Sequence, residues 1–335
     1  MLQRYAHRTC VLTASTQGIG LATAARFLLE GGQVVISSRK KDQVQEKVEE
    51  LETLMRNTFE AKSETAVRAF FCGNQNQNNF NVGEASDMMK EMVKKKLIIP
   101  GKVVGKVCHQ ANANDRLELL KFALSSFQTN KIDVLVLNAA ASTHYGEFIH
   151  LPEKSIDKMF ETNVKSTILF AQEAKPFLMP ENEKNENNNT LLFPEYNFSP
   201  CISITSSVGA YVPCSPVGFY SASKTMLLGV TKALAENYSH YGVRVNSVCP
   251  GVTRTRLAEK LVEQVQQNNN NNSENNNKKH EKLANAAGGL NDGGFMHRVG
   301  DPREVAAGIA FLCSRDASFI TGENLVIGGG GFYHL

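Results

Sequence analysis

Two side chains that can move a proton stand four residues apart in the segment Tyr220-Ser-Ala-Ser-Lys224. Apolar periodicity predicts a helix over 219–238, and a spacing of four puts both side chains on one face of that helix. An ammonium close to a phenol stabilises the phenolate and lowers the pKa of the tyrosine from about 10. The pair could then act as a general acid or base near neutral pH. Because Tyr-x-x-x-Lys is a common spacing on helices, the pair needs support from elsewhere in the chain.

Polar residues follow two apolar segments that are expected to be buried parallel strands. Ser207 comes after the fifth expected strand, and Asn138 comes directly after the fourth. In parallel α/β sheets ligands bind at the carboxyl ends of the strands, so both side chains are expected at the site. Asn163 falls inside an expected helix, where Asn is unfavourable unless its amide has a partner. The alternative interpretation of Asn163 is an exposed polar residue.

A turn that contains two glycines joins the first expected strand to the first expected helix. Its sequence is Thr13-Ala14-Ser15-Thr16-Gln17-Gly18-Ile19-Gly20. Glycine lets the pyrophosphate of a dinucleotide approach the backbone, and a helix N-terminus supplies N–H groups and a positive dipole. Gly18 and Gly20 meet that need, and the hydroxyls of Ser15 and Thr16 can add donors. The place between strand and helix favours this interpretation over an ordinary glycine-rich turn.

The second expected strand ends in Ser37-Ser38-Arg39-Lys40. A cofactor with a free ribose 2′-hydroxyl usually meets an Asp or Glu there, about 20 residues after the glycines. In this chain Ser38 offers a hydroxyl, and Arg39 offers a planar set of donors that suits a 2′-phosphate. The sequence therefore predicts NADPH/NADP+ rather than NADH. The alternative is that Arg39 and Lys40 merely begin the next helix on its solvated side.

Apolar strands alternate with amphipathic helices along the chain. This predicts an α/β fold with a doubly wound, Rossmann-type parallel sheet of about seven strands and helices on both faces, in a single domain over 1–335. The expected strands are 10–13, 34–37, 103–108, 132–137, 202–205, 243–249 and 324–327, and the expected helices are 18–30, 42–56, 116–127, 155–177, 219–238 and 303–313. Three Asn-rich stretches, at about 59–101, 180–200 and 264–294, are interpreted as surface insertions because Asn tracts offer little apolar surface to bury. The first of them also predicts a helix at 85–95.

With these motifs in this order, the chain resembles the short-chain dehydrogenase/reductase family over about residues 8–330 outside the insertions. The resemblance is carried by the turn 13–20, Asn138-Ala139-Ala140, Asn163, Ser207, Tyr220-x-x-x-Lys224, Pro250-Gly251 with Thr253 and Thr255, and Arg298-x-Gly300-x-Pro302. The segments 13–16, 37–40, 107–109 and 320–323 are most similar to the NADPH-dependent carbonyl and retinal reductases of the family.

The resemblance implies a role for each of these residues. Tyr220 would donate a proton to a carbonyl oxygen that Ser207 holds, and Lys224 would lower the pKa of Tyr220 and bind the nicotinamide ribose. Asn163 would place a water that links Lys224 to solvent. The cofactor-binding residues it implies are Thr13, Ser15, Thr16, Gly18, Ile19, Gly20, Ser38, Arg39, Lys40, His109, Asn138, Ala139, Ala140, Tyr220, Lys224, Pro250, Gly251, Val252, Thr253 and Thr255. It also implies a homo-oligomer, commonly a tetramer.

The chain departs from the family pattern at three places, one of which is the common Asn-Asn-Ala-Gly motif, where Leu137 and Ala140 replace the outer residues. Ala14 stands where the family commonly has the first glycine of the turn, and a methyl group is usually tolerable there. Cys108-His109 replaces the frequent Asp-Val after the third strand, so the contact from Asp to adenine is missing. His109 either substitutes for that contact or is only a surface residue.

Together these features predict an enzyme that reduces a ketone or aldehyde to an alcohol with NADPH by reversible hydride transfer. A 3-oxoacyl carrier-protein reductase of fatty-acid synthesis uses the same residues and stays open as an alternative, because specificity lies in the loops at 141–151, 208–219 and 252–299. A non-catalytic NADP(H)-binding scaffold is an alternative from another class, although such proteins typically lose the Tyr or the Lys.

Composition argues against other classes of function. Lys and Arg number 36 against 33 Asp and Glu, and this near balance gives no reason to expect nucleic acid as a partner. No apolar run reaches about 18 residues, so no membrane span is expected, and the eight His show no metal-binding spacing. Seven scattered cysteines predict reduced thiols in a cytoplasmic protein. The end Tyr333-His334-Leu335 loosely resembles a peroxisomal targeting tail, which keeps that compartment as an alternative.

Overall fold

Seven parallel strands form the central sheet in a computed structural model that describes residues 3–60, 82–179, 198–213, 217–259 and 294–330. The strand order is β3-β2-β1-β4-β5-β6-β7, which confirms the expected fold class. The strands are β1 (Thr9–Leu12), β2 (Gln33–Ser38), β3 (Lys102–Val107), β4 (Val134–Leu137), β5 (Cys201–Thr205), β6 (Arg244–Pro250) and β7 (Asn324–Ile327). The order changes direction between β1 and β4, and sheets of this type bind ligands in the crevice at that point.

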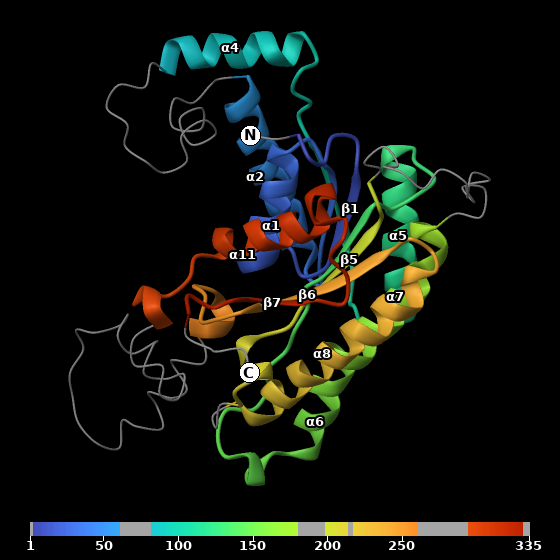
Figure 1. Cartoon of the computed structure of the whole chain (residues 1–335), viewed down its shortest axis with the longest axis vertical. Coiled ribbons are helices and arrows are strands. Elements are labelled where there is room, and N and C mark those ends of the chain that lie inside the picture. The colour runs from blue at the N-terminus through green and yellow to red at the C-terminus, as the bar shows by residue number, and fades with distance from the viewer. Residues whose placement is uncertain (1–2, 61–81, 180–197, 214–216, 260–293, 331–335) are drawn as a thin grey trace.

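Helices cover both faces of the sheet (Figure 1). On one face lie α1 (Gly18–Leu29), α2 (Lys41–Phe59) and α11 (Pro302–Cys313), and on the other lie α5 (Ala113–Phe127), α7 (Ser166–Leu178) and α8 (Gly218–Ser239). Every residue of β1, β4, β5 and β6 is buried, as expected for parallel strands packed on both faces. Two separate apolar clusters, one for each face, form the core.

The helix expected as one piece at 155–177 is interrupted. It consists of α6 (Glu153–Met159), a π-helical segment (Phe160–Lys165) and α7. Side-chain periodicity alone could not reveal this, because a π-helical turn adds a residue to the helix without changing its apolar character. Such segments are rare and are often found at functional sites. The π-helical segment contains Asn163.

The first Asn-rich insertion contributes structure at both of its ends. Helix α2 continues to Phe59, three residues beyond its expected end, and α4 (Val82–Lys94) forms where 85–95 was expected to be helical. Met89 of α4 is fully buried and belongs to the same apolar cluster as Met55 and Phe59 of α2. Residues 61–81 of this insertion, nearly all of the second and the Asn tract of the third lie outside the described residues, so the boundaries of the insertions stay predictions.

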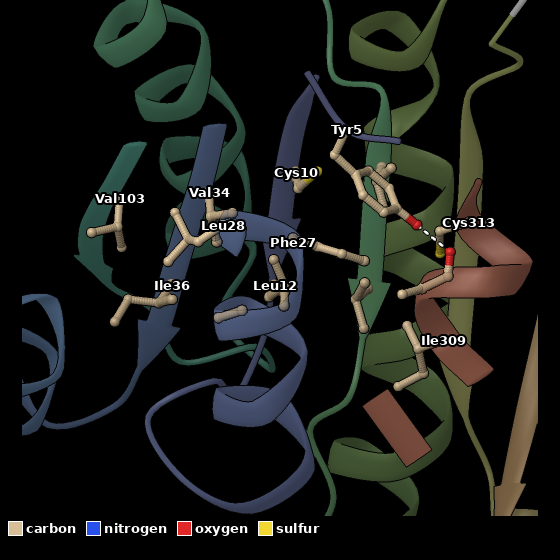
Figure 2. Packing of buried hydrophobic residues seen from close by; sticks show 14 of the residues in the cluster. Tyr5, Cys10, Leu12, Phe27, Leu28, Val34, Ile36, Val103, Ile309 and Cys313 are labelled. Atoms are coloured by element: carbon tan, nitrogen blue, oxygen red, sulfur yellow. Dashed lines mark hydrogen bonds between the residues drawn. The ribbon is translucent and has the colours of Figure 1, made fainter. Parts of the chain in front are cut away.

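The N-terminal segment is part of the core. Tyr5 is fully buried, its ring lies 4.4 Å from that of Phe27, and its hydroxyl donates to the carbonyl oxygen of Ala310 (Figure 2). The first residues of the chain are thereby joined to α11, which is near its end. Among the described residues, no helix combines the length and apolar character that a membrane crossing needs.

Candidate functional site

Lys224 is fixed between α8 and the end of β5. It is 1% exposed, and its Nζ donates to the carbonyl oxygen of Thr205 at 2.6 Å. The same Nζ lies 5.6 Å from the centre of the Tyr220 ring, so the two side chains share a face of α8 as the spacing predicted. Ser206 strengthens this junction, because its Oγ donates to the backbone carbonyl of Lys224 at 2.9 Å.

Burial shifts both of these groups toward their neutral forms. It raises the pKa of Tyr220 to about 12, an effect that the hydroxyl of Ser207 opposes and that Tyr145 increases. Burial lowers the pKa of Lys224 to about 8, and Cys249 nearby partly offsets this. The expectation that Lys224 lowers the pKa of Tyr220 is therefore corrected for this geometry, since burial is the larger influence.

Ser207 lies beside Tyr220 at the start of a short 3-10 helix (Val208–Ala210). Its Oγ accepts a hydrogen bond from the N–H of Gly209 at 3.1 Å and so caps that helix. Because the hydroxyl also acts on the pKa of Tyr220, the serine and the tyrosine are brought together as the sequence predicted. A carbonyl oxygen between them would meet two hydroxyl groups.

Asn163 is 0% exposed, which rules out its interpretation as an exposed polar residue. Its amide binds both backbone groups of Ala141: Oδ1 accepts from N at 2.7 Å, and Nδ2 donates to O at 2.9 Å. Nδ2 also donates to Oγ of Ser223 at 3.0 Å, and that hydroxyl donates to the carbonyl of Tyr220 at 2.6 Å. Asn163 thus ties the loop after β4 to the turn of α8 that carries the tyrosine.

Asn138 joins the turn after β1 to the ends of β4 and β5. Its N–H donates to Oγ1 of Thr13 at 2.9 Å, and its Nδ2 donates to the carbonyl of Ala14 at 3.2 Å. Thr205 donates to Oδ1 of Asn138 at 3.0 Å. Ala139 also donates to Oγ1 of Thr13, at 3.3 Å. Residues at three strand ends therefore lie next to one another, across the point where the strand order changes direction.

The turn 13–20 has the shape that a bound phosphate requires. A Cβ on Gly20 would meet the carbonyl oxygen of Ala14 at 2.5 Å, and Gly18 has a φ of +54°, so neither position readily accepts a side chain. Helix α1 has no side-chain cap on its first N–H groups and no acidic residue in its first turn. Those N–H groups are the donors that bind anions at helix N-termini.

The hydroxyl partners of Ser15 and the backbone conformation of Ala14 differ from what the sequence suggested. Ser15 is fully buried, and its Oγ donates to the carbonyl of Leu12 at 2.9 Å and accepts from the N–H of Ser37 at 2.8 Å. Its expected role as a hydroxyl donor to a phosphate is corrected: it connects the turn to β1 and β2. Ala14 accommodates its methyl group only in a left-handed conformation, at a φ of +47°.

The loop after β6 reaches back over the same turn. Thr255 packs on Gly18, where a Cβ would lie 3.2 Å from Cγ2 of the threonine. Thr253 forms a parallel bridge with Gly300, and the N–H of Gly300 donates to the carbonyl of Val252 at 2.9 Å. The motif Arg298-x-Gly300-x-Pro302 therefore positions this loop. Pro250 and Gly251 end β6 beside β7, since the N–H of Gly251 donates to Ile327 at 2.9 Å.

The residues expected near the ribose lie at the outer edge of the site. Ser38 is partly buried at the end of β2, and Arg39 and Lys40 are exposed. The guanidinium of Arg39 makes no hydrogen bond or ion pair with the described residues. The backbone N–H of His109, after β3, donates to the carboxylate of Asp115 at 2.8 Å.

The arrangement fits a nicotinamide dinucleotide. The turn 13–20 and the N-terminus of α1 would hold the pyrophosphate, and the ends of β2 and β3 would hold the adenosine side. The loop 250–255 and Lys224 would hold the nicotinamide side. Among the residues that the structure describes, no group of three or more His, Cys, Asp and Glu side chains is placed to hold a metal ion.

Four residues important to this geometry were not singled out from the sequence. Thr205 and Ser223 act through hydrogen bonds to Lys224 and Asn163, and Ser142 and Tyr145 lie in the loop after β4. Position after a strand was a usable signal for Thr205. Nothing in the local sequence distinguishes the other three from ordinary loop or helix residues.

Comparisons with known proteins identify relatives of this chain over nearly its whole length. Residues 85–331 match a family described as enoyl-(acyl carrier protein) reductase. The chain is 33% identical to tropinone reductase-like 3 from Erythroxylum coca over 98% of this chain and 94% of the relative. It is 32% identical to dehydrogenase/reductase SDR family member 4 from Sus scrofa over 97% of this chain and 87% of the relative. A 3-ketoacyl-(acyl-carrier-protein) reductase from Brucella melitensis complexed with NADH has a similar fold, with a TM-score of 0.67, 21% identity, and 97% and 98% of the two chains covered.

Proposed function

Because this chain belongs to the short-chain dehydrogenase/reductase family and is therefore an oxidoreductase, we propose that it is an NADPH-dependent carbonyl reductase. The observation that supports this most directly is the meeting of Tyr220, Ser207 and Lys224 at the carboxyl end of β5. Two relatives support the proposal by their names, tropinone reductase-like 3 and dehydrogenase/reductase SDR family member 4, because both names contain the word reductase.

The chain's own residues divide the work between proton transfer and orientation. Ser207 and Tyr220 bind the carbonyl oxygen of the substrate. Since burial raises the pKa of Tyr220 to about 12, its hydroxyl keeps its proton at neutral pH and can donate it to the oxygen as the alcohol forms. Lys224 would hold the nicotinamide ribose and would restore the proton of Tyr220. Asn163 would place the water that connects Lys224 to solvent through a group other than its Nδ2, which already donates to Ala141 and Ser223. Bound NADPH supplies the hydride.

The preference for NADPH rests on Ser38 and Arg39. Arg39 is exposed at the end of β2 without a partner among the described residues, so its guanidinium is available to a 2′-phosphate. We expect Arg39→Ala to weaken NADPH binding about tenfold and NADH binding hardly at all. Arg56→Ala, near the C-terminal end of α2, is the matched control and should change neither dissociation constant. A tighter binding of NADH by the wild type would contradict the assignment.

Reduction of a 3-oxoacyl thioester is the second candidate, because a protein of similar fold, the one from Brucella melitensis, is a 3-ketoacyl-(acyl-carrier-protein) reductase. The two candidates differ in substrate and share the same residues. An acetoacetyl thioester in the substrate panel, beside retinal and an aromatic diketone, separates them. A homo-oligomer is proposed by analogy with the family, and a monomeric mass in solution would contradict it.

The experiment that tests the proposal measures NADPH consumption with this panel for the wild type and for Tyr220→Phe. We expect the variant to lose at least about a hundredfold in kcat, because a general acid contributes that much or more, while its dissociation constant for NADPH stays close to that of the wild type. Tyr241→Phe removes the hydroxyl of an exposed tyrosine beyond the end of α8 and should keep full activity. Equal rates for wild type and Tyr220→Phe would remove Tyr220 from the mechanism, and a wild type inactive on the whole panel would refute the proposed function.

A further inference from the structure

The loop 141–151 is fixed at two points beside the catalytic helix. At its start, Asn163 binds both backbone groups of Ala141. Further along, Gly146 forms an isolated parallel bridge with Val217, the residue that precedes α8. Val217 is three residues before Tyr220, so this part of the loop lies against the turn that carries the catalytic hydroxyl.

Aromatic packing holds the same loop after the bridge. Phe148 packs on the first residues of α8. A Cβ added to Gly218 would lie 2.8 Å from a ring atom of Phe148, and the ring centroids of Phe148 and Phe219 are 6.4 Å apart. The segment between Ala141 and Gly146 is therefore held on both sides. Its side chains have a defined place next to Tyr220.

Two hydroxyls in this segment are buried without a partner. The Oγ of Ser142 and the phenolic oxygen of Tyr145 are shielded from water, and neither makes a hydrogen bond within the described parts of the chain. The neighbouring polar side chains do have partners: His144 contacts the carbonyl of Glu147 at 3.2 Å, and Thr143 donates to Ser155 at 3.5 Å. Buried hydroxyls without a partner are uncommon in native proteins and call for an explanation.

The two hydroxyls lie close to each other and to the reaction site. Burial raises the pKa of Tyr145, and the hydroxyl of Ser142 opposes this increase, although the two do not have the geometry of a hydrogen bond. Tyr145 in turn raises the pKa of Tyr220, which it can do only from nearby. The unpartnered hydroxyls therefore border the place where the substrate carbonyl binds.

We propose that Tyr145, with Ser142, forms a second hydrogen-bonding position for the substrate, next to the carbonyl oxygen that Ser207 and Tyr220 bind. A hydroxyl can donate or accept, so the position fits an oxygen substituent on the carbon beside the reacting carbonyl. A substrate that carries such an oxygen supplies the partner that both hydroxyls lack, and a plain ketone leaves them unpaired. This rests on the proposed reductase function and adds the residues that select among its substrates.

Matched pairs of ketones test the position. The pairs are acetophenone with 2-hydroxyacetophenone and cyclohexanone with 2-hydroxycyclohexanone, assayed with NADPH. We expect the wild type to favour the hydroxyketone of each pair in kcat/KM. In Tyr145→Phe this preference, taken as the ratio of the two kcat/KM values, should fall about tenfold, which is the effect of one lost hydrogen bond to a substrate. Ser142→Ala should lower the preference in the same direction by a smaller factor, and Tyr241→Phe should leave it unchanged.

Each other outcome has a definite meaning. A wild type without a preference for the hydroxyketones overturns the inference, as does a preference that survives in Tyr145→Phe. An equal fall in kcat/KM for both ketones of a pair in Tyr145→Phe also overturns the inference, because Tyr145 would then act on Tyr220 or on the loop rather than on the substrate. If the wild type reduces neither these ketones nor the panel above, the proposed function fails, and the inference fails with it.

Discussion

At the scale of single residues, burial disfavours the charged forms of the two titratable side chains at the site, Tyr220 and Lys224. Tyr220 and Lys224 are both buried, and loss of contact with water disfavours phenolate and ammonium alike. The pKa of the lysine falls to about 8 and that of the tyrosine rises to about 12. In the proposed mechanism, Lys224 is then the group that would control proton transfer between substrate and solvent over the neutral and mildly alkaline range.

This predicts a pH dependence with a definite sign. As pH rises through about 8, Lys224 loses its proton while Tyr220 keeps its own, so kcat/KM for carbonyl reduction should fall above about pH 8. The profile is measured with saturating NADPH. Lys232→Met, an exposed lysine on the same helix, should keep the same profile, and Lys224→Met should lose most of the activity at every pH. A flat profile between about pH 7 and pH 10 would contradict the prediction.

At the scale of elements, the π-helical segment and its Asn163 connect the loop after β4 to α8. Four hydrogen bonds pass through Ala141, Asn163, Ser223 and Tyr220. A continuous α-helix would change the direction of the Asn163 side chain, since each residue of a π-helical turn is rotated relative to the α-helical course. The irregular segment is thus what places an amide between the loop and the catalytic helix.

Asn163→Ala should therefore lower stability and activity more than a substitution of an exposed Asn would. The N–H and C=O of Ala141 lose their partners, so we expect the free energy of unfolding to fall by about 1–3 kcal/mol and kcat/KM for a reducible ketone to fall at least about tenfold. Urea unfolding and steady-state kinetics measure the two effects. Asn237→Ala, an exposed Asn on α8, is the matched control with little expected change. Full activity in Asn163→Ala would show that the loop holds its place by other contacts.

At the scale of the whole molecule, one apolar cluster joins the two ends of the described chain. Tyr5 packs on Phe27 of α1 and donates to Ala310 of α11 (Figure 2). Next to it, Arg4 and Arg26 both bind the buried carboxylate of Glu30, each with an Nε–O distance of 2.5 Å. These contacts lie at the amino ends of the strands, away from the site at their carboxyl ends.

Removing Tyr5 should lower stability without changing the chemistry. Tyr5→Ala leaves a cavity and an unpaired carbonyl, so we expect a loss of about 3–5 kcal/mol in the free energy of unfolding. Tyr5→Phe loses only the hydrogen bond and should cost about 1–3 kcal/mol. Phe319→Ala, at a fully exposed aromatic residue, is the control with almost no expected loss. Below the unfolding transition kcat should match the wild type in all three variants, and a lower kcat in Tyr5→Ala would show that the core reaches the site.

The sequence determined the order of elements and supplied most of the groups that are proposed to react. Continuous apolar runs predicted the buried strands, and β7 was placed residue for residue at Asn324–Ile327. These features could be predicted from the sequence because they depend on local periodicity and on which residues follow each strand. The four-residue spacing of Tyr220 and Lys224 likewise places them on one face of any α-helix.

Only the tertiary structure decided how these groups act. The π-helical segment, the burial that shifts the pKa values of Tyr220 and Lys224, the use of Ser15 to hold its turn, and the place of Tyr145 all depend on contacts between distant parts of the chain. Local sequence fixes which groups a residue carries. Dielectric environment and hydrogen-bond partners come from packing, and packing is a property of the folded chain as a whole.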